Sequence, residues 1–457
     1  DRRRVRRPVP EEEMIIVRGA WVLTQGPAGE LRDAAVAVEG GAVAAVGSFA
    51  QLRQQHPDAE VIGDGTGVVT PGFVNAHTHL SEALATGIGS ELRLAEWGAQ
   101  VIGPLGAVLT EADAHEGTRL RAIELLLSGV TTVNDMFVHY NPDAMASLGV
   151  VSGLRSAGLR GVVSFGAEDL DLWGDVDRML AEHDALASAA GGLISFRYGV
   201  GTLLGQTDAL LEAGIAHARE RGWAVHTHLH ETREEVAASL DRWGERPIAH
   251  ADALGLFELP VIAGHAVWVD DDEVALLAAR GVTIAHNPVA NAILGSGVAP
   301  VARWRGLDAG IGTDGAASND SQNMLEAIKW AALLQKVHHL DPAVIDARAV
   351  LSMATIGGAR ALGLEAVIGS LEPGKRADVV LFQDTVEVGV LHDPAGQLVY
   401  GASPRAVADV LIDGERVVRD HRVVTVDERA QLELCRPLVA RIARDAGFAA
   451  SGVSRAG

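Results

Sequence analysis

The sequence lacks several features that would assign it to other protein classes. Its 457 residues include one cysteine, Cys435, which excludes an internal disulfide and a cysteine-based zinc finger. No purely apolar run reaches about eighteen residues, so no membrane-spanning segment is expected. The net charge is -22, and so acidic a chain disfavours nucleic-acid binding, which needs a basic face. Only three lysines occur, Lys329, Lys336 and Lys375.

The composition is that of a soluble globular protein, with 48% hydrophobic and 21% charged residues. The length suits one large domain and a smaller one. Residues 1–14 carry an arginine cluster without the apolar stretch of a signal peptide, and we expect them to form a disordered leader. Together these features predict a cytoplasmic protein.

Both ends of the chain have the pattern of short strands. Residues 15–69 and 368–425 alternate apolar and polar positions around turn pairs such as Gly40-Gly41 and Asp413-Gly414. We expect the two segments to combine into one small β-sandwich. Residues 426–457 predict a C-terminal helix and tail.

The middle of the chain, residues 70–367, alternates apolar strand-like runs with helical stretches rich in Ala, Leu and Glu. Several of these stretches end in glycine before the next strand, as at Gly222 in RERGWAV. No glycine-rich phosphate loop follows the first strand, which argues against a doubly wound sheet. The pattern predicts an α/β fold, a (β/α)8 TIM barrel. Its predicted strands are 68–79, 131–136, 159–165, 194–200, 223–231, 261–267, 282–288 and 309–315.

Histidines recur where these strands end, which in a barrel is the functional face. The first strand ends with His77 and His79. Residues two apart on a strand point to the same side, so both imidazoles can reach one ion. The fifth strand carries His226, His228 and His230 in the same phase, and not all three need be ligands.

Three further strands end in polar groups. The sixth ends at His265, the seventh at His286, and the eighth at Asp314, which precedes a glycine. Taken alone, Asp314 has the ordinary alternative of a turn or a helix cap. Because all of these groups are expected on the same rim of the barrel, their combination predicts a metal site.

Three neutral imidazoles and one carboxylate around a divalent ion leave room for a water, as in catalytic metal sites. Such an ion lowers the pKa of water from 15.7 to roughly 7. Glu231, three residues past His228, is the candidate to shuttle the proton, and His265 is the candidate to orient the activated water.

Six longer motifs contain or accompany these residues: PGFVNAHTH, HTHLHET, GHAVWVDDDEV, HNPVANAILGSGVAP, GTDGAASND and IGSLEPGKRADVVLF. In combination they resemble the amidohydrolase superfamily. Within it, the chain is most similar to the deaminase and chlorohydrolase branch, which includes methylthioadenosine/S-adenosylhomocysteine deaminases, guanine-type deaminases and triazine hydrolases. The resemblance spans most of residues 15–425 and implies a hydrolase acting on C–N bonds other than peptide bonds.

The resemblance also implies residue roles. The metal is expected to be Zn²⁺, with Fe²⁺ as the other candidate. Members with two metals bridge them by a carbamylated lysine on a middle strand, and here all three lysines follow Asp314, so we expect one ion. The implied ligands are His77, His79, His228 and Asp314, and the implied catalytic residues are Glu231, His265 and Asp314.

Five residues are candidates for substrate contact. Trp97 could stack on a flat heterocycle or pack within a helix, with equal weight. His286 could donate to a ring atom or support the core, and Glu82 could bind an amino group or stay solvated. The complete set is Glu82, Trp97, Thr202, His286 and Asn291.

Two stretches differ from the pattern expected of deaminases that act on adenosine thioethers. Gly199 to Leu204 stand in place of a His-Ala-Pro-Tyr-Thr-like run, and Ala85-Thr86-Gly87 stands in place of an arginine-glycine pair. Because both stretches tend to line the pocket, we expect a substrate other than methylthioadenosine or S-adenosylhomocysteine.

The favoured hypothesis is an aminohydrolase that deaminates an amino-substituted N-heteroaromatic compound, such as a purine, pterin, nucleoside or triazine, by metal-activated water. The alternatives are dechlorination or dealkylamination of a triazine-like ring, cyclic amide hydrolysis and, remotely, a catalytically silent scaffold. The expected partner is a small heterocyclic substrate, with no nucleic acid and no membrane. A homo-oligomer, dimeric or larger, is compatible with the sequence.

Overall fold

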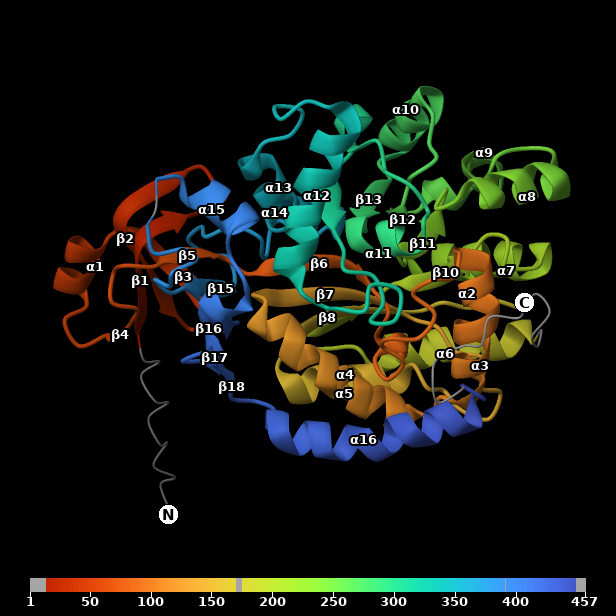
Figure 1. Cartoon of the computed structure of the whole chain (residues 1–457), viewed down its shortest axis with the longest axis horizontal. Coiled ribbons are helices and arrows are strands. Elements are labelled where there is room, and N and C mark those ends of the chain that lie inside the picture. Colours follow the sequence, from red (N-terminus) through yellow and green to blue (C-terminus); the bar gives the residue numbers. More distant parts are fainter. Residues whose placement is uncertain (1–13, 170–174, 391, 449–457) are drawn as a thin grey trace, which may run out of the picture.

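The computed structural model describes residues 14–169, 175–390 and 392–448. The predicted leader over 1–14 lies outside these ranges except for Met14, as does the end of the predicted tail. Figure 1 shows a set of strands surrounded by helices, with a smaller group of strands at one end, where the N-terminal (red) and C-terminal (blue) segments meet. None of the described helices is long and apolar enough to cross a bilayer.

The large sheet is entirely parallel. Its strands are β6 (Phe73–Thr78), β7 (Val130–Phe137), β8 (Arg160–Phe165), β9 (Ile194–Phe196), β10 (Tyr198–Thr202), β11 (Val225–Leu229), β12 (Val261–His265), β13 (Thr283–His286) and β14 (Ala309–Ile311). The order is β10-β11-β12-β13-β14-β6-β7-β8-β9. β9 pairs with β8 and β10 pairs with β11, while a parallel bridge joins Ala167, just past β8, to Val200. The sheet therefore returns on itself, and the predicted TIM-like barrel is confirmed.

Two of the predicted strands are interrupted. The segment 68–79 forms β5 (Val68–Pro71), which belongs to the small sheet, and then β6 of the barrel. The break falls at Gly72, where a Cβ atom would lie 2.1 Å from Oγ1 of Thr131, so this close approach requires glycine. The predicted strand 194–200 is divided at Arg197 into β9 and β10.

Helices alternate with the barrel strands, as the sequence pattern predicts. α7 illustrates their ends: the Thr207 hydroxyl accepts from the N–H of Leu210, and Gly222 ends the helix with φ 66°. The bounds are α2 (Leu94–Trp97), α3 (Gly103–Val108), α4 (Glu111–Leu127), α5 (Leu148–Ala157), α6 (Val176–Ala189), α7 (Asp208–Arg221), α8 (Arg233–Trp243), α9 (Pro247–Ala253), α10 (Asp271–Arg280), α11 (Pro288–Ile293), α12 (Met324–His339), α13 (Ala347–Met353), α14 (Ile356–Ala361) and α15 (Pro394–Tyr400).

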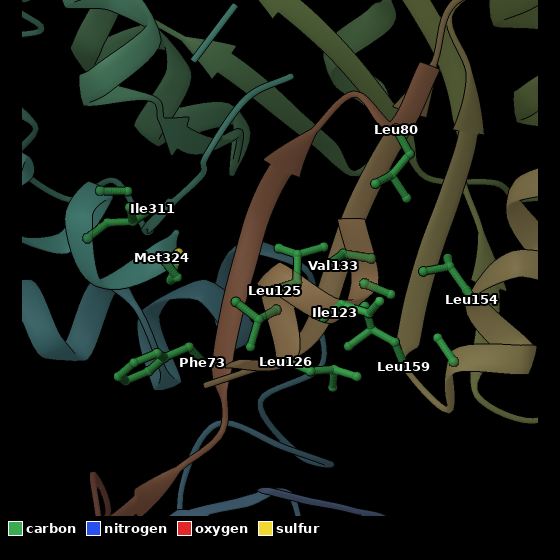
Figure 2. Packing of buried hydrophobic residues seen from close by; sticks show 14 of the residues in the cluster. Phe73, Leu80, Ile123, Leu125, Leu126, Val133, Leu154, Leu159, Ile311 and Met324 are labelled. Atoms are coloured by element: carbon green, nitrogen blue, oxygen red, sulfur yellow. The ribbon is translucent and has the colours of Figure 1, made fainter. Parts of the chain in front are cut away.

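Apolar packing between α4 and the barrel fixes the first strands. Figure 2 shows Leu125 and Leu126 of α4 close to Phe73 of β6 and Val133 of β7, and all four side chains are buried. Burial of one such side chain contributes about 1.5–3 kcal/mol relative to exposure. This packing sets the position of β6, from which the first two predicted metal ligands project.

The two ends of the chain form one mixed sheet. Its strands are β1 (Ile15–Leu23), β2 (Glu30–Glu39), β3 (Ala42–Ser48), β4 (Glu60–Ile62), β5, β15 (Val379–Phe382), β16 (Val407–Ile412), β17 (Glu415–Arg419) and β18 (Arg422–Val423), with α1 (Phe49–Gln55) between β3 and β4. The order is β18-β17-β16-β15-β5-β1-β2-β3, and β4 pairs with β1. Val36 of β2 and Leu411 of β16 share one buried cluster, and Gly414 lies against Gly41. The sheet is therefore curled so that its halves face each other, which confirms the predicted β-structure built from both ends.

The last described helix is α16 (Glu428–Asp445), which runs along α4 in Figure 1. Arg441 forms an ion pair with Asp113 at the start of α4. The side chain of Gln431 donates to the carbonyl of Glu116 at 3.0 Å, and Cys435 is buried beside it. The C-terminal helix is thus attached to α4, the helix that precedes β7.

Candidate metal centre and active site

The four predicted metal ligands lie together at the carboxyl ends of the barrel strands. His77 belongs to β6 and His79 follows it, His228 belongs to β11, and Asp314 follows β14. All four are buried. The Nε2 atoms of His79 and His228 are 3.0 Å apart. Oδ1 of Asp314 lies 3.5 Å from Nε2 of His77 and 3.4 Å from Nε2 of His79, so the four side chains converge on one point.

The hydrogen bonds of two imidazoles decide which nitrogen carries the proton. Nδ1 of His79 donates to the carbonyl of Met136, and Nδ1 of His228 donates to the carbonyl of Gly201, each at 2.6 Å. A carbonyl only accepts, so both protons lie on Nδ1, and in the neutral rings two Nε2 lone pairs face each other. This contact is repulsive unless a cation lies between them, and the pattern is that of metal-bound histidines.

His77 is oriented by a longer chain of hydrogen bonds. Its Nδ1 lies 2.7 Å from Nε2 of His226, and Nδ1 of His226 lies 3.2 Å from Oγ of Ser164. Ser164 donates onward to the carbonyl of Asp135 at 2.8 Å, which is consistent with a proton on Nδ1 of both rings. Nε2 of His77 then has no hydrogen-bond partner among the described residues and is directed at Asp314. His226 is therefore a positioning residue for His77.

Burial keeps these imidazoles neutral. It lowers the pKa of His77 to about 4 and also lowers the pKa values of His79 and His228. Burial alone would raise the pKa of Asp314, but its contact with His77 and the charge of His265 outweigh this effect and lower the pKa. Three neutral nitrogen donors and one carboxylate are a donor set that suits a divalent ion such as zinc.

Glu231 and His265 lie beside the ligands. Nε2 of His265 is 3.4 Å from Oε2 of Glu231 and 3.9 Å from Oδ2 of Asp314. Nδ1 of His265 donates to Oδ1 of Asn291 at 2.8 Å, and the Ser296 hydroxyl donates to Oε1 of Glu231 at 3.2 Å. Burial raises the pKa of Glu231 to about 7. Burial also lowers the pKa of His265, but the charges of Glu231 and Asp314 more than compensate and raise it.

Two residues of the site adopt a left-handed backbone. φ is 74° at His265 and 64° at Asp314, a region that residues other than glycine rarely occupy. The backbone N–H of Asp314 donates to the carbonyl of His77 at 3.0 Å, which holds the turn against β6. Such strain clusters at functional sites, where the surrounding structure fixes it.

The centre opens into a cavity of about 610 Å³, a usual size for a small-molecule site. No lysine or arginine is among the described residues that line it. One wall is apolar and includes Leu94, Trp97, Ile102, Val138 and Leu294, and the carboxylates that reach the cavity are Glu82, Glu168, Glu231 and Asp314.

Three of the five predicted substrate contacts line this cavity, namely Glu82, Trp97 and Thr202. Glu82 is buried and accepts from the backbone N–H groups of Ala317 and Ser318 at 2.9 Å and 2.8 Å. Burial raises its pKa to about 8. The carboxylate thus holds the loop after β14 as well as lining the cavity.

The other two predicted substrate contacts, His286 and Asn291, are not among the lining residues. His286 ends β13 and is buried against Trp304, with ring centroids 5.7 Å apart, and burial lowers its pKa to about 3. Asn291 accepts from His265 and so orients that ring. The structure therefore gives both residues places behind the cavity wall, in contrast to the contact with substrate that the sequence suggested.

Sequence reasoning missed Glu168, Tyr140 and the positioning role of His226. Glu168 stands three residues past the predicted third strand, so the signal that identified Asp314, a carboxylate at a strand end, was present. Tyr140 donates to Oε2 of Glu168 at 2.9 Å, a contact between the ends of two different strands that the sequence does not reveal.

Comparisons with known proteins agree with this architecture. Residues 68–417 match the amidohydrolase family, and residues 34–59 match an imidazolonepropionase-like composite domain of bacteria. The 5-methylthioadenosine/S-adenosylhomocysteine deaminase of Desulforudis audaxviator is 39% identical over 426 residues, covering 92% of this chain and 96% of that protein. The 5'-deoxyadenosine deaminase of Methanosarcina mazei is 34% identical and covers 94% and 99%.

Solved structures are similar over nearly the whole chain. An adenosine deaminase from Xanthomonas campestris with bound zinc has a TM-score of 0.87 at 31% identity, covering 95% of this chain and 100% of that one. Atrazine chlorohydrolase from Arthrobacter aurescens, complexed with zinc, has a TM-score of 0.85 at 26% identity, covering 93% and 100%. The family match, the identities and the barrel-end histidines lead to one conclusion: this chain belongs to the amidohydrolase family.

Proposed function

We propose that this protein is a metal-dependent aminohydrolase that deaminates the adenine ring of a nucleoside. The observation that carries the proposal is the convergence of the four ligands on one point, with Glu231 beside them in a cavity of small-molecule size. Three of the four similar proteins described above are named as deaminases of adenosine or of adenosine derivatives, which supports the choice of ring.

The ligands are proposed to hold one divalent ion, Zn²⁺, with Fe²⁺ as the alternative. When bound, such an ion lowers the pKa of a water from 15.7 to roughly 7. Two similar structures, an adenosine deaminase and a chlorohydrolase, contain zinc. The three lysines lie on α12 or just before β15, away from the cavity lining, which supports a single ion without a lysine bridge.

Glu231 is proposed to move the proton. A pKa of about 7 suits a carboxyl group that must both accept and donate near neutral pH. The oxygen of water bonds to C6 of adenine, one proton of that water passes through Glu231 to N1, and the C6–N bond breaks. The second proton leaves with the amino group as ammonia, and the ring keeps the oxygen as a carbonyl. His265, held by Asn291, orients the water oxygen.

The acidic cavity favours nucleosides without a negative charge. A 5'-phosphate would meet carboxylates and no lining lysine or arginine among the described residues. The apolar wall with Leu94 and Ile102 suits a deoxy or methylthio group. The sequence led us to expect a substrate other than methylthioadenosine, because a family motif is missing near Gly201. The apolar wall of the cavity suits the methylthio group all the same, so methylthioadenosine is included among the proposed substrates. Two relatives are named as deaminases of 5-methylthioadenosine and of 5'-deoxyadenosine, which supports this choice.

The test is product release from a matched panel by zinc-loaded protein. We expect ammonia from adenosine, 5'-deoxyadenosine and methylthioadenosine, and at least tenfold lower kcat/KM for adenosine 5'-phosphate, since a desolvated charge without a partner costs on the order of 1–3 kcal/mol or more. Chloride release from a chlorotriazine, with no ammonia from any nucleoside, would contradict the proposal and favour the dechlorination alternative.

A further inference from the structure

We propose that Glu168 is the specificity-determining residue that accepts a hydrogen bond from one of the vicinal hydroxyls of the substrate's ribose. This inference rests on the proposed function and extends it to a carboxylate that the deamination chemistry does not use. Glu168 follows β8 at the carboxyl end of the barrel, lines the same cavity as the metal ligands and is partly exposed there.

The surroundings of the Glu168 side chain suit a carboxylate. Its Oε1 accepts from the backbone N–H and the hydroxyl of Thr202 at 3.0 Å and 2.9 Å, and its Oε2 accepts from the hydroxyl of Tyr140 at 2.9 Å. A Cβ atom at Gly201 would lie 2.7 Å from the Glu168 side chain, and one at Gly205 would lie 2.4 Å from it. The chain therefore leaves room for this side chain at two glycines and directs three donors at it.

One acceptor position of this carboxylate remains open. A carboxylate oxygen accepts about two hydrogen bonds, so Oε1 is satisfied by Thr202, whereas Oε2 has only Tyr140. No cation is among the groups that stabilise the charge of Glu168 within the described residues, and burial raises its pKa despite the three donors. A ligand that donates hydroxyl protons would complete the site and stabilise the charged form.

The carboxyl group of Glu168 is linked to the metal centre through β10. The carbonyl of Gly201 accepts from Nδ1 of the metal ligand His228 at 2.6 Å, and the next residue, Thr202, donates to Glu168. Two successive residues of one strand, about 3.3 Å apart along it, thus contact the metal ligand and the carboxylate. One substrate of nucleoside size can reach both.

The chemistry of an adenine nucleoside leaves only one partner for Glu168. The ring nitrogens N1, N3 and N7 accept hydrogen bonds, and the 6-amino group, the only donor of the base, reacts at the metal centre. The remaining donors are the sugar hydroxyls. A 5'-deoxy or 5'-methylthio nucleoside keeps only those at C2' and C3', so the open acceptor position of the carboxylate is assigned to one hydroxyl of this pair.

The experiment compares adenosine with 2',3'-dideoxyadenosine as substrates of the zinc-loaded protein. A hydrogen bond to a charged group predicts that wild-type kcat/KM for adenosine exceeds that for the dideoxy compound about 10- to 100-fold. In Glu168→Gln, the amide oxygen can still accept from Thr202, but the amide nitrogen then replaces Oε2 and cannot accept from the sugar. We expect the ratio to fall to near one, with kcat/KM for the dideoxy compound changed less than about threefold.

Glu182→Gln is the matched control, because Glu182 is a hydrogen-bonded glutamate of the same barrel that is fully buried, contacts His139 and lies outside the cavity lining. It should leave the ratio at the wild-type value even if it lowers the amount of folded protein. A ratio unchanged in Glu168→Gln would overturn the ribose assignment alone. So would a wild-type ratio near one, which needs no variant to fold. Absence of ammonia from both nucleosides with wild-type protein would instead overturn the proposed function.

Discussion

The metal centre and the cavity wall around Glu168 are built in different ways. In the metal centre, the Nε2 atoms of His79 and His228 face each other without a proton between them. Nε2 of His77 has no hydrogen-bond partner within the described part of the chain. In the wall, Tyr140 and Thr202 already satisfy most of the carboxylate, and one acceptor position remains open. The first arrangement requires a cation, whereas the second requires a hydrogen-bond donor.

The difference indicates how one barrel separates reaction from selectivity. The centre is buried and preorganised for water activation whichever ring occupies the cavity. The wall is partly exposed and distinguishes substrates by their sugar. Substitutions in the centre should therefore lower turnover of every substrate alike, and substitutions in the wall should change the ratio between substrates.

The largest effect is expected from loss of a ligand. His228→Ala removes one nitrogen donor, and a metal contribution of several kcal/mol corresponds to at least about a 10³-fold loss of kcat/KM for all nucleosides. Metal analysis of the purified variant should find clearly less than one ion per chain. Full activity with full metal content in His228→Ala would show that the ion is held elsewhere.

The next effect concerns the proton shuttle. Glu231→Gln should keep the metal and lose about 10²- to 10⁴-fold in kcat, the usual contribution of a general acid–base group. In wild type, kcat/KM should fall about tenfold per pH unit as the pH drops below about 7, because Glu231 must be deprotonated to accept the proton. A bound cation beside Glu231 acts against the effect of burial and lowers this pKa, so the acid limb is expected at or below about pH 7. If the residual kcat/KM of Glu231→Gln fell with decreasing pH in the same way as that of wild type, the titrating group would be a residue other than Glu231.

A smaller effect is expected from the residue that orients His77. His226→Leu removes the acceptor of the Nδ1 proton of His77, and such losses typically cost about 10- to 100-fold in metal affinity. Competition with a chelator measures this affinity. His183→Gln is the control, since His183 is equally buried but bonded to carbonyls outside the centre. Equal metal affinities in the two variants would mean that His226 contributes packing alone and does not orient His77.

The barrel, and the convergence of the four candidate ligands at its carboxyl end, could be predicted because their signals are local. His77 and His79 are two apart on one strand, and glycine ends such as Gly222 mark the helices. The break between β5 and β6 could not be predicted, since β5 is held by pairing of Thr70 with Val380, far along the chain. A continuous apolar run in the sequence does not indicate which sheet each part of it will join.

Residues whose role depends on distant partners were harder to interpret. His286 has the same strand-end position as His265, but the structure places it against Trp304 instead of the cavity. Glu168 becomes a binding candidate only when Tyr140 and Thr202 are brought to it from other strands. Sequence spacing reports which residues share an element, and it does not report which elements meet.

Anomalous diffraction at the zinc edge, recorded from crystals of the zinc-loaded protein, tests the shared metal site most directly. The prediction is one zinc per chain, with Nε2 of His77, His79 and His228 at about 2.0–2.1 Å and a carboxylate oxygen of Asp314 at about 2.0–2.2 Å. A pair of ions, or a single ion away from these four side chains, would contradict it.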